Sequence, residues 1–491
     1  MTKFSIADLM ARSGVKFGTS GARGLVTDLS DRIAYAYTAG FLGHLARSGQ
    51  LGNAKGVVVA GDLRPSTARI VAAAARAVRA RGLEVINAGR IPSPALMLAG
   101  LARGVPSVMV TGSHIPDDRN GIKFNSARGE ILKADEVGIR AEEVDLPEIF
   151  DEKGLLDPAA SVLPPVDPEP ARAYVQRWLS AFPRSLAGMR VGVYGHSAVG
   201  RELLVEVLEG LGAEVLRLGW SERFIPVDTE AIREEDVKLA HGWAREHQLD
   251  ALVSTDGDSD RPLIADESGT FFRGDVACVL AARFLGASFV AAPVSCNSVL
   301  ERSGLFKSVR TRIGSPFVIE AMLAAQAQGE PRVVGYEANG GFLHVSSLDV
   351  PGGGQLSPLP TRDPLVVQLS LLCDAQQRKV PLSALARDLP ARFTASDRIE
   401  NFASELGQKL VANLTQGGAH AAEKAFPALG RFKEKNELDG LRMTFENDEV
   451  VHVRPSGNAP ELRCYVEAAS VERSVELLRY GMGRLSELSR G

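Results

Sequence analysis

KGVVVA at residues 55–60 is a short run of apolar and β-branched residues, which the loop GDLRPS at 61–66 and a helical pattern over 67–82 follow. A strand, a polar loop and a helix in this order are typical of parallel α/β units. The pattern recurs, and further strands are predicted over residues 105–110, 189–194, 249–254 and 331–334. Because ligands bind outside the carboxyl ends of strands in open α/β sheets, the loops after these strands are the expected functional positions.

Composition limits the classes of partner. The chain has 491 residues, with 56 Lys and Arg against 60 Asp and Glu and a formal net charge of −4. At about 150 residues per domain this length predicts roughly three to four domains, and the hydrophobic content is enough for several cores. The nearly balanced charge disfavours nucleic acid, and no apolar run reaches the ~18 residues of a membrane span. We therefore expect no nucleic-acid partner and no membrane partner.

The cysteines and the first residues indicate a compartment. The four cysteines are far apart in sequence, which is typical of neither a zinc site nor a dense disulfide framework. A reducing environment is the simplest interpretation. Asp8 and Arg12 interrupt the apolar residues near the start, unlike the apolar segment of a signal peptide. We expect a cytoplasmic protein.

Changes in composition divide the chain into four expected domains. Residues 155–170 are rich in Pro and Asp, which is typical of a linker. A turn signal at 266–269 precedes a new helical pattern, and the sequence changes again around 378–392, beyond which short strands predict a small α+β domain. The expected domains are residues 1–160, 161–268 and 269–385, all of the α/β type, and 386–491.

The loop DGDSDR at residues 256–261 carries three carboxylates at alternate positions, from Asp256, Asp258 and Asp260. Mg²⁺ and Ca²⁺ prefer oxygen ligands, so a tight turn here would form a site for a hard cation. An EF-hand is a rival interpretation, but its sixth position requires Gly, and this chain has Arg261 there. A predicted strand also stands where an EF-hand needs a helix. A solvated acidic turn is the remaining alternative.

Two loops of the first expected domain carry groups that suit a phosphate. TGSHIP at residues 111–116 places Ser113 beside His114, and this serine is a nucleophile, a phosphate carrier or an ordinary turn serine. Lys123 is either a point charge for a phosphate or a surface lysine. FGTSGARG at residues 17–24 offers backbone amides and Arg23 to an anion, or is a flexible turn.

Two later loops carry further polar groups. RPSGNAP at residues 454–460 can surround a phosphate that is held but not reacted, or form a simple Pro-Gly hairpin loop. GYEANGGF at residues 335–342 presents one carboxylate and one amide, the usual partners of sugar hydroxyls, although an exposed loop carboxylate is the plainer alternative.

Together and in this order, the five loops resemble those of the α-D-phosphohexomutases, the superfamily of phosphomannomutase, phosphoglucomutase and phosphoglucosamine mutase. The resemblance runs from Phe17 to Ala468. It implies an α/β protein of four domains around a central cleft, with three related α/β domains and a smaller C-terminal α+β domain. It also implies Mg²⁺, an active serine carried as phosphoserine, and a hexose 1,6-bisphosphate that serves as intermediate and activator.

The resemblance implies roles for individual residues of this chain. Ser113 is the implied phosphoserine, and the implied Mg²⁺ ligands are Ser113, Asp256, Asp258 and Asp260. The implied catalytic groups are Ser113, Arg23, His114, Lys123 and Arg261. The implied substrate-binding residues are Arg312, Glu337, Asn339, Arg454, Ser456, Gly457, Asn458 and Arg463.

The motifs also depart from the family pattern, at Ile115, Ser259, Asn339, Gly341, Asn458 and Ala459. In the sugar loop, a Ser and a His that many mutases carry are replaced by Asn339 and Gly341, whereas the Glu is kept as Glu337. A Glu-Ala-Asn-Gly-Gly loop resembles one branch of bacterial phosphomannomutases that are associated with sugar nucleotides for surface polysaccharides. This resemblance favours mannose.

The implied function is that of an isomerase of the phosphomannomutase/phosphoglucomutase type, which interconverts hexose 1-phosphate and hexose 6-phosphate, with mannose preferred and glucose left open. The alternatives are a phosphoglucosamine mutase and a non-catalytic sugar-phosphate-binding protein. We expect small-molecule hexose phosphates as partners and a monomer or homodimer. Because the two implied phosphate sites lie on the first and last domains, substrate should draw the fourth domain inward.

Overall fold

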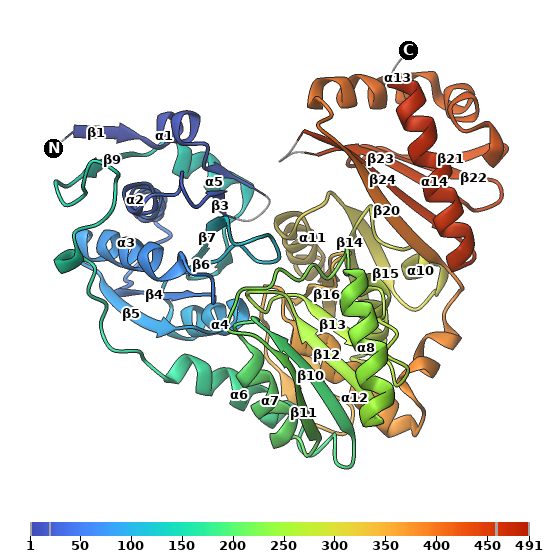
Figure 1. The fold of residues 1–491 in the computed structure, drawn as a ribbon, viewed down its shortest axis with the longest axis horizontal. Coiled ribbons are helices and arrows are strands. Elements are labelled where there is room, and N and C mark those ends of the chain that lie inside the picture. The colour runs from blue at the N-terminus through green and yellow to red at the C-terminus, as the bar shows by residue number, and fades with distance from the viewer. Residues whose placement is uncertain (1, 19–20, 457–459, 490–491) are drawn as a thin grey trace.

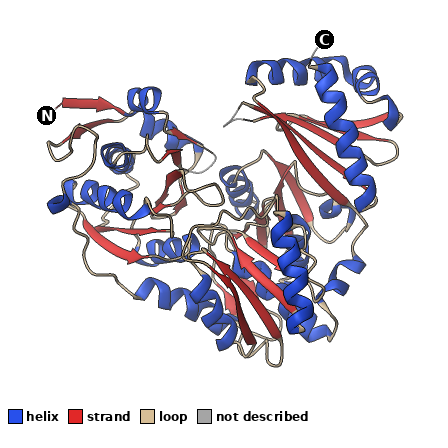
Figure 2. Ribbon diagram, viewed as in Figure 1, coloured by secondary structure: helices blue, strands red, loops and turns tan. Residues whose placement is uncertain are grey.

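Four successive units make up the fold. The computed structural model describes residues 2–18, 21–456 and 460–489. The units follow one another along an arc from the N-terminal unit to the C-terminal one (Figure 1). Helices and strands are mixed throughout, and the last unit has an antiparallel sheet with long helices beside it (Figure 2).

The first unit is a mixed sheet with helices packed against it. Its elements are β1 (Thr2–Ser5), α1 (Ile6–Ser13), β2 (Lys16–Phe17), β3 (Ala22–Leu25), α2 (Asp31–Arg47), β4 (Gly56–Gly61), α3 (Thr67–Ala80), β5 (Glu84–Gly89), α4 (Ser93–Arg103), β6 (Ser107–Val110), β7 (Arg119–Ser126), β8 (Gly129–Glu130), α5 (Lys133–Arg140) and β9 (Glu143–Leu146). The strand order is β2-β3-β7-β6-β4-β5. β4 is buried along its whole length, as expected for an apolar strand in the middle of a covered sheet.

The second unit follows a linking segment that contains the 3₁₀ turn η1 (Pro158–Ala160). Its elements are α6 (Glu169–Ala181), β10 (Arg190–His196), α7 (Arg201–Gly210), β11 (Glu214–Trp220), α8 (Glu234–His247), β12 (Ala251–Thr255) and β13 (Pro262–Ala265). The strand order is β11-β10-β12-β13, in which the first three strands are parallel and β13 is antiparallel to β12.

The third unit repeats the strand order of the second. Its elements are α9 (Gly274–Phe284), β14 (Phe289–Pro293), α10 (Val299–Arg302), β15 (Lys307–Thr311), α11 (Ser315–Ala327), β16 (Val333–Tyr336), β17 (Phe342–His344), β18 (Leu348–Asp349), β19 (Gln355–Leu356) and α12 (Pro364–Arg378). Its order β15-β14-β16-β17 again ends in one antiparallel strand. The first unit contains the same arrangement as β5-β4-β6-β7, so the three units share one topology.

The fourth unit is an antiparallel sheet, which agrees with the smaller α+β domain predicted there. Its elements are β20 (Phe393–Glu400), α13 (Ser404–Ala425), η3 (Pro427–Leu429), β21 (Phe432–Asn436), β22 (Leu441–Phe445), β23 (Val450–Pro455), β24 (Glu461–Ala468) and α14 (Val471–Leu488). The 3₁₀ helix η2 (Leu382–Asp388) precedes them and packs with the third unit. The strand order is β20-β24-β23-β22-β21. None of the described helices is both long and apolar enough to span a bilayer.

The buried residues show which units are joined by apolar packing. One cluster extends from Val58 in the first unit through Val191 and Val253 in the second to Val290 in the third. The fourth unit has a cluster of its own, which includes Phe426 and Phe445. The first three units therefore share a continuous core, whereas the fourth folds around a separate one.

Candidate active site

Three of the predicted loops occupy the same position in the three related units. Residues 111–118 connect β6 to β7, residues 256–261 connect β12 to β13, and residues 337–341 connect β16 to β17. Each loop therefore joins the last parallel strand to the antiparallel strand of its unit. These positions lie at carboxyl ends of strands, where the sequence predicted functional groups.

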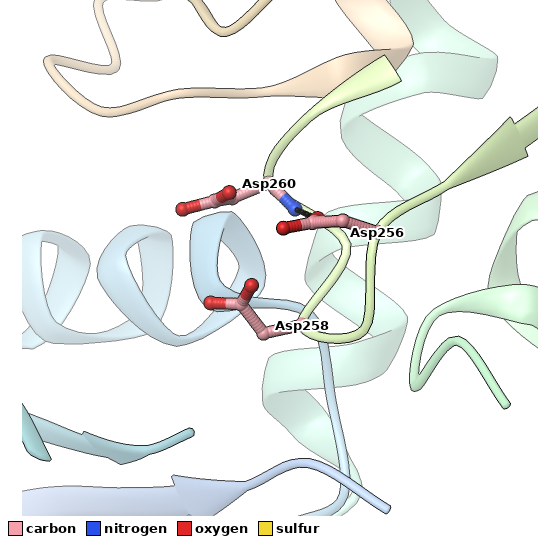
Figure 3. Close-up of side chains that lie close together, drawn as sticks. All are labelled: Asp256, Asp258 and Asp260. Atoms are coloured by element: carbon pink, nitrogen blue, oxygen red, sulfur yellow. Dashed lines mark hydrogen bonds between the residues drawn. The ribbon is translucent and has the colours of Figure 1, made fainter. Parts of the chain in front are cut away.

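The acidic loop gathers its three carboxylates. Ligand oxygens of Asp256, Asp258 and Asp260 lie within 4.8 Å of one another, and all three residues are buried. The turn is closed by Asp256 Oδ1, which accepts the backbone N–H of Asp260 at 3.1 Å and of Arg261 at 3.2 Å. Figure 3 shows the three side chains on the same side of this turn. Ser259 has a φ of +53°, a left-handed conformation that a residue with a side chain rarely adopts.

The electrostatics of this cluster fit a hard divalent cation. Burial and the neighbouring Asp258 raise the pKa of Asp256 well above its ordinary value. Asp258 Oδ1 and Asp260 Oδ1 are buried and accept no hydrogen bond from any residue that the structure describes. Buried carboxylates this close repel one another unless a cation neutralises them. The oxygen-only donor set is the type that Mg²⁺ binds.

Lys123 supplies part of the neutralising charge. Its Nζ donates to Asp258 Oδ2 and to Asp260 Oδ2, at 2.6 Å in both cases. Although burial favours the neutral acid, Lys123 holds the pKa of Asp258 below its ordinary value. Lys123 comes from β7 of the first unit, so this ion pair joins the first unit to the acidic loop of the second.

Ser113 points at the same cluster. Its Oγ donates a hydrogen bond to Asp256 Oδ2 at 2.6 Å, and the residue is 1% exposed. Its φ of +55° is rare for a residue with a side chain, and such strain is concentrated at functional sites. The backbone N–H of Ser113 donates to Thr111 Oγ1 at 2.8 Å, which holds the turn. The structure thus brings the predicted phosphoserine onto the predicted metal loop.

His114 lies beside the serine as a neutral imidazole. Burial and then Arg261 lower the pKa of His114 to about 3. Its Nδ1 accepts a hydrogen bond from Arg261 Nη1 at 2.9 Å, and Ser113 Oγ lies 3.4 Å from the same nitrogen. A neutral ring at neutral pH can accept a proton, which is one requirement of a general base.

Arg23 is the cation of this group without a carboxylate partner. Within the described chain its guanidinium makes no hydrogen bond and no ion pair of 4.0 Å or less. Burial and the nearby Arg261 lower the pKa of Arg23 to about 10. Cations that face one another are stabilised by a shared anion, and guanidinium groups suit phosphate oxygens.

Arg64 shapes the serine loop, and the sequence interpretation did not assign it a role. The side chain is 2% exposed and pairs with Asp62 through Nε at 3.1 Å. Its Nη2 donates to the carbonyl oxygens of Ser113 at 2.7 Å and Ile115 at 2.6 Å, and its Nη1 donates to that of Pro116 at 2.8 Å. One guanidinium therefore holds the loop backbone, including Ile115, where the sequence departs from the pattern of the family that it resembles.

Replacing Arg64 with methionine is expected to lower the free energy of unfolding of the first unit by about 3–5 kcal/mol, because it leaves the buried Asp62 and several carbonyls unpaired. Amide hydrogen exchange of residues 111–118 with a denaturant titration measures this loss. Arg69→Met is the matched control, since Arg69 also bonds a carboxylate and carbonyls but donates to none of residues 111–118. Unchanged protection of residues 111–118 in Arg64→Met would show the prediction to be wrong.

The sugar loop is tied to the acidic loop by a second arginine that the sequence interpretation missed. Arg362 Nη1 donates to Glu337 Oε2 at 2.9 Å, and Arg362 Nε donates to Asp260 Oδ2 at 3.0 Å. Asn339 Oδ1 accepts the N–H of Gly341 at 2.9 Å, so its amide oxygen turns back onto its own loop. The signal available for Arg362 was a charged pair, Arg-Asp, directly before the proline that begins α12.

The remaining predicted residues form a second group around the fourth unit. Arg454 pairs through Nε with Asp439 Oδ1 at 2.7 Å and lies opposite Arg463 across β23 and β24. Arg312 is exposed and donates to the carbonyl of Leu438 at 3.2 Å. Like charges opposite one another destabilise a strand pair, and an anion between them removes the repulsion.

The loop beside these arginines is described in part. Ser456 is buried, and its backbone N–H donates to the carbonyl of Glu461 at 2.8 Å. Gly457 and Asn458 lie outside the described residues. Among the residues that are described, no hydrogen bond joins this group to the acidic loop or to Ser113. The structure therefore places the predicted residues that it describes in two groups rather than one.

Comparison with known proteins identifies the family. The descriptions of phosphoglucomutase/phosphomannomutase α/β/α domains I, II and III match residues 14–143, 172–269 and 273–393, and that of the C-terminal domain matches residues 410–478. A phosphomannomutase of Sinorhizobium fredii is 42% identical to this chain over 96% of this chain and 99% of that protein. The chain belongs to the phosphoglucomutase/phosphomannomutase family.

Further members support this assignment. A phosphomannomutase of Salmonella muenchen is 40% identical over 97% of this chain and 96% of that protein. A solved phosphoglucomutase/phosphomannomutase family protein from Burkholderia thailandensis superposes with a TM-score of 0.71 at 20% identity, covering 96% of this chain and 98% of that one. The predicted fold class is confirmed. As a phosphohexomutase the chain is an isomerase of a generally Mg²⁺-dependent family, and its acidic loop fits that metal.

Proposed function

We propose that this protein is a phosphomannomutase that interconverts hexose 1-phosphate and hexose 6-phosphate through phosphoserine 113, with mannose phosphate as its preferred substrate. The observation that carries the proposal is the 2.6 Å hydrogen bond from Ser113 Oγ to Asp256 Oδ2, which joins a nucleophile and an acidic metal loop from different units. The relatives at 42% and 40% identity, both phosphomannomutases, support mannose.

Asp256, Asp258 and Asp260, with the oxygen of Ser113, are the residues that would hold Mg²⁺. When bound, the metal supplies positive charge that stabilises the oxygens of a transferring phosphoryl group. Arg23 and Arg261 add cationic groups around the same phosphoryl group, and Lys123 on β7 adds a further positive charge. Phosphoryl transfer requires positioning and charge neutralisation more than covalent chemistry, which suits this set of residues.

The proposed reaction has two transfers. Phosphoserine 113 gives its phosphoryl group to the free hydroxyl of a hexose phosphate, whose proton passes to the neutral imidazole of His114, and a hexose 1,6-bisphosphate forms. The bisphosphate then turns around, and its other phosphoryl group returns to the Ser113 oxygen while a proton returns to the departing sugar oxygen. Added hexose 1,6-bisphosphate activates by phosphorylating free Ser113. Each transfer leaves the enzyme ready for the next.

Two binding regions would hold the bisphosphate in either orientation, so that each of its phosphates can face Ser113. Glu337 and Asn339 are the proposed partners of sugar hydroxyls, and the proposed residues of the distal phosphate site are Arg312, Arg454, Ser456, Gly457, Asn458 and Arg463. The separate core of the fourth unit allows it to move as a body and bring this site toward Ser113. We further propose that the enzyme acts in the cytoplasm on small-molecule hexose phosphates, as a monomer or homodimer.

Turnover of mannose 1-phosphate, glucose 1-phosphate and glucosamine 1-phosphate tests this proposal. Each is incubated with enzyme, Mg²⁺ and a trace of glucose 1,6-bisphosphate, and the 6-phosphate is followed by ³¹P NMR. The expected kcat/KM is highest for mannose 1-phosphate, by about 10-fold or more over glucosamine 1-phosphate. Conversion of glucosamine 1-phosphate alone would refute the mannose preference. Absence of any conversion would favour the non-catalytic sugar-phosphate-binding alternative.

A further inference from the structure

Arg362 connects two loops that belong to different units. Its Nε and Nη2 lie 3.0 Å and 2.9 Å from Asp260 Oδ2 of the acidic loop, and its Nη1 lies 2.9 Å from Glu337 Oε2 of the sugar loop. The residue is 2% exposed. A planar guanidinium with several fixed donors suits this arrangement, whereas a lysine ammonium has neither the span nor the planar fork.

The neighbouring sequence holds Arg362 in place. Asp363, the next residue, begins α12 by accepting the N–H of Leu365 at 3.2 Å, and it also accepts the hydroxyl of Tyr174 at 2.7 Å. Thr361, the preceding residue, donates to Glu130 Oε1 of the first unit at 2.7 Å. Arg362 thus projects from a backbone that is anchored on both sides, so the position of its guanidinium is preorganised.

Gly341 provides the space that Arg362 fills. A Cβ added at residue 341 would lie 2.5 Å from Arg362 Cδ and 2.6 Å from Cγ, closer than real contacts of this kind. The backbone of Gly341 is not in the left-handed region, so space rather than conformation requires glycine here. Gly341 and Arg362 are therefore one structural unit: a side chain at 341 and the observed position of Arg362 exclude each other.

The bridge leaves part of Glu337 available. Oε2 is bonded by Arg362, whereas Oε1 accepts no hydrogen bond from any described residue and is not fully buried. A carboxylate fixed through one oxygen presents the other in a defined direction, which lowers the entropy lost when a hydroxyl binds. Resting on the proposed role of Glu337 in binding sugar hydroxyls, we infer that Arg362 is a positioning residue that orients Glu337 for the sugar.

The same bridge gives Arg362 an opposite effect on the metal. Arg362 and Lys123 both bond Asp260 Oδ2, and both place positive charge beside the proposed Mg²⁺ ligands. Removing the Arg362 charge leaves Asp260 Oδ2 with one bonding partner fewer. It also removes the electrostatic repulsion between the guanidinium and the metal ion. Loss of Arg362 should therefore tighten Mg²⁺ binding while it weakens sugar-phosphate binding, a pair of opposite changes that general damage to the fold does not produce.

Calorimetric titrations test this inference, with all variants in the Ser113→Ala background so that no turnover occurs. Arg362→Met is expected to weaken mannose 1-phosphate binding about 10- to 100-fold, and Arg362→Lys to restore little of it, because a charged hydrogen bond that positions Glu337 is lost. Mg²⁺ titrated alone should bind several-fold more tightly to Arg362→Met. Arg177→Lys is the matched control, since Arg177 is half-buried and bonds Ser357 outside the acidic loop, and it should change neither affinity.

Two combined variants identify the route of the effect. If Arg362 acts through Glu337, the variant with both Arg362→Met and Glu337→Gln should bind mannose 1-phosphate no more weakly than the weaker single variant. Gly341→Ala should weaken binding when Arg362 is present and have little effect beside Arg362→Ala, which lacks the Cγ and Cδ that a Cβ at residue 341 would meet. Multiplied effects in the double variant, or unchanged sugar binding with Arg362→Met, would overturn the inference. If the parent protein binds none of the hexose phosphates, the proposed function fails first, whereas the Mg²⁺ titration still reports the Arg362 charge.

Discussion

Replacing Ser113 with alanine is expected to lower kcat by about 10⁴-fold or more while the dissociation constant for mannose 1-phosphate stays within about threefold. The variant lacks the oxygen that would carry the phosphoryl group, and none of the other proposed residues replaces it. The hydroxyl donates only to Asp256 Oδ2 at 2.6 Å and contacts His114, so its removal leaves the proposed sugar and distal phosphate residues in place. ³¹P NMR measures turnover, and calorimetry measures binding.

Ser107→Ala is the matched control for this variant. Ser107 is also buried and lies on β6 of the same unit, where its hydroxyl accepts the side-chain amide of Asn125 at 2.9 Å, away from the acidic loop. Near-normal turnover is expected. If Ser113→Ala kept near-normal turnover, the phosphoserine mechanism would be excluded. An equal loss in both variants would point to damage of the β6 strand rather than to lost chemistry.

Replacing Asp258 with asparagine is expected to weaken Mg²⁺ binding about 100-fold or more and to lower kcat in parallel at fixed Mg²⁺. The amide keeps an oxygen that accepts the hydroxyl of Ser93, which bonds Asp258 Oδ2 at 2.6 Å, so the local packing is preserved while the charge is lost. Lys123 also loses one of its two carboxylate partners. Titration calorimetry measures the metal affinity directly.

The Mg²⁺ dependence of the melting temperature gives a second measure of this loss. A ligand that binds the folded state raises the Tm, so the parent protein should show a rise with Mg²⁺ that Asp258→Asn lacks. Asp266→Asn is the control: Asp266 is a buried aspartate at the other end of β13, where its Oδ1 closes a turn with Ser268 and Thr270. Equal metal affinity in Asp258→Asn and the parent protein would exclude Asp258 as a ligand.

The sequence was sufficient to predict the elements that carry the site. The predicted strand over 189–194 corresponds to β10, and the predicted helix over 67–82 to α3. Ser113 and the acidic loop lie together, as the ordered motifs implied. Each motif is a short continuous stretch, so it can be recognised from the sequence without knowing which residues surround it in the fold. The boundaries at residues 160, 268 and 385 stay predictions, as do the catalytic and binding roles of individual residues.

The sequence alone did not indicate which groups Arg64 and Arg362 contact. Arg64 donates to backbone carbonyl oxygens of a loop about fifty residues later, at positions 113, 115 and 116. Every residue has a backbone carbonyl, so the residue types at these positions do not indicate this contact. Arg362 acts on side chains of two other loops, and its partner Gly341 reads as an ordinary loop glycine until the distance between them is known. Contacts between separate units depend on how the sheets pack, which local patterns do not encode.

The shared position of the three loops has a consequence for how such enzymes diversify. Each of the three copies of one topology contributes the segment between its last two strands, so the proposed nucleophile, metal ligands and sugar contact are each encoded by a separate short stretch. On the proposed roles, substitutions within residues 337–341 would alter which sugar is accepted while the serine and aspartate stretches stay unchanged, whereas a change at residue 362 would affect both loops through its bonds to Glu337 and Asp260. On the proposed roles, sugar preference and phosphoryl chemistry lie on separate short stretches, so a lineage can change the first at residues 337–341 without rebuilding the second.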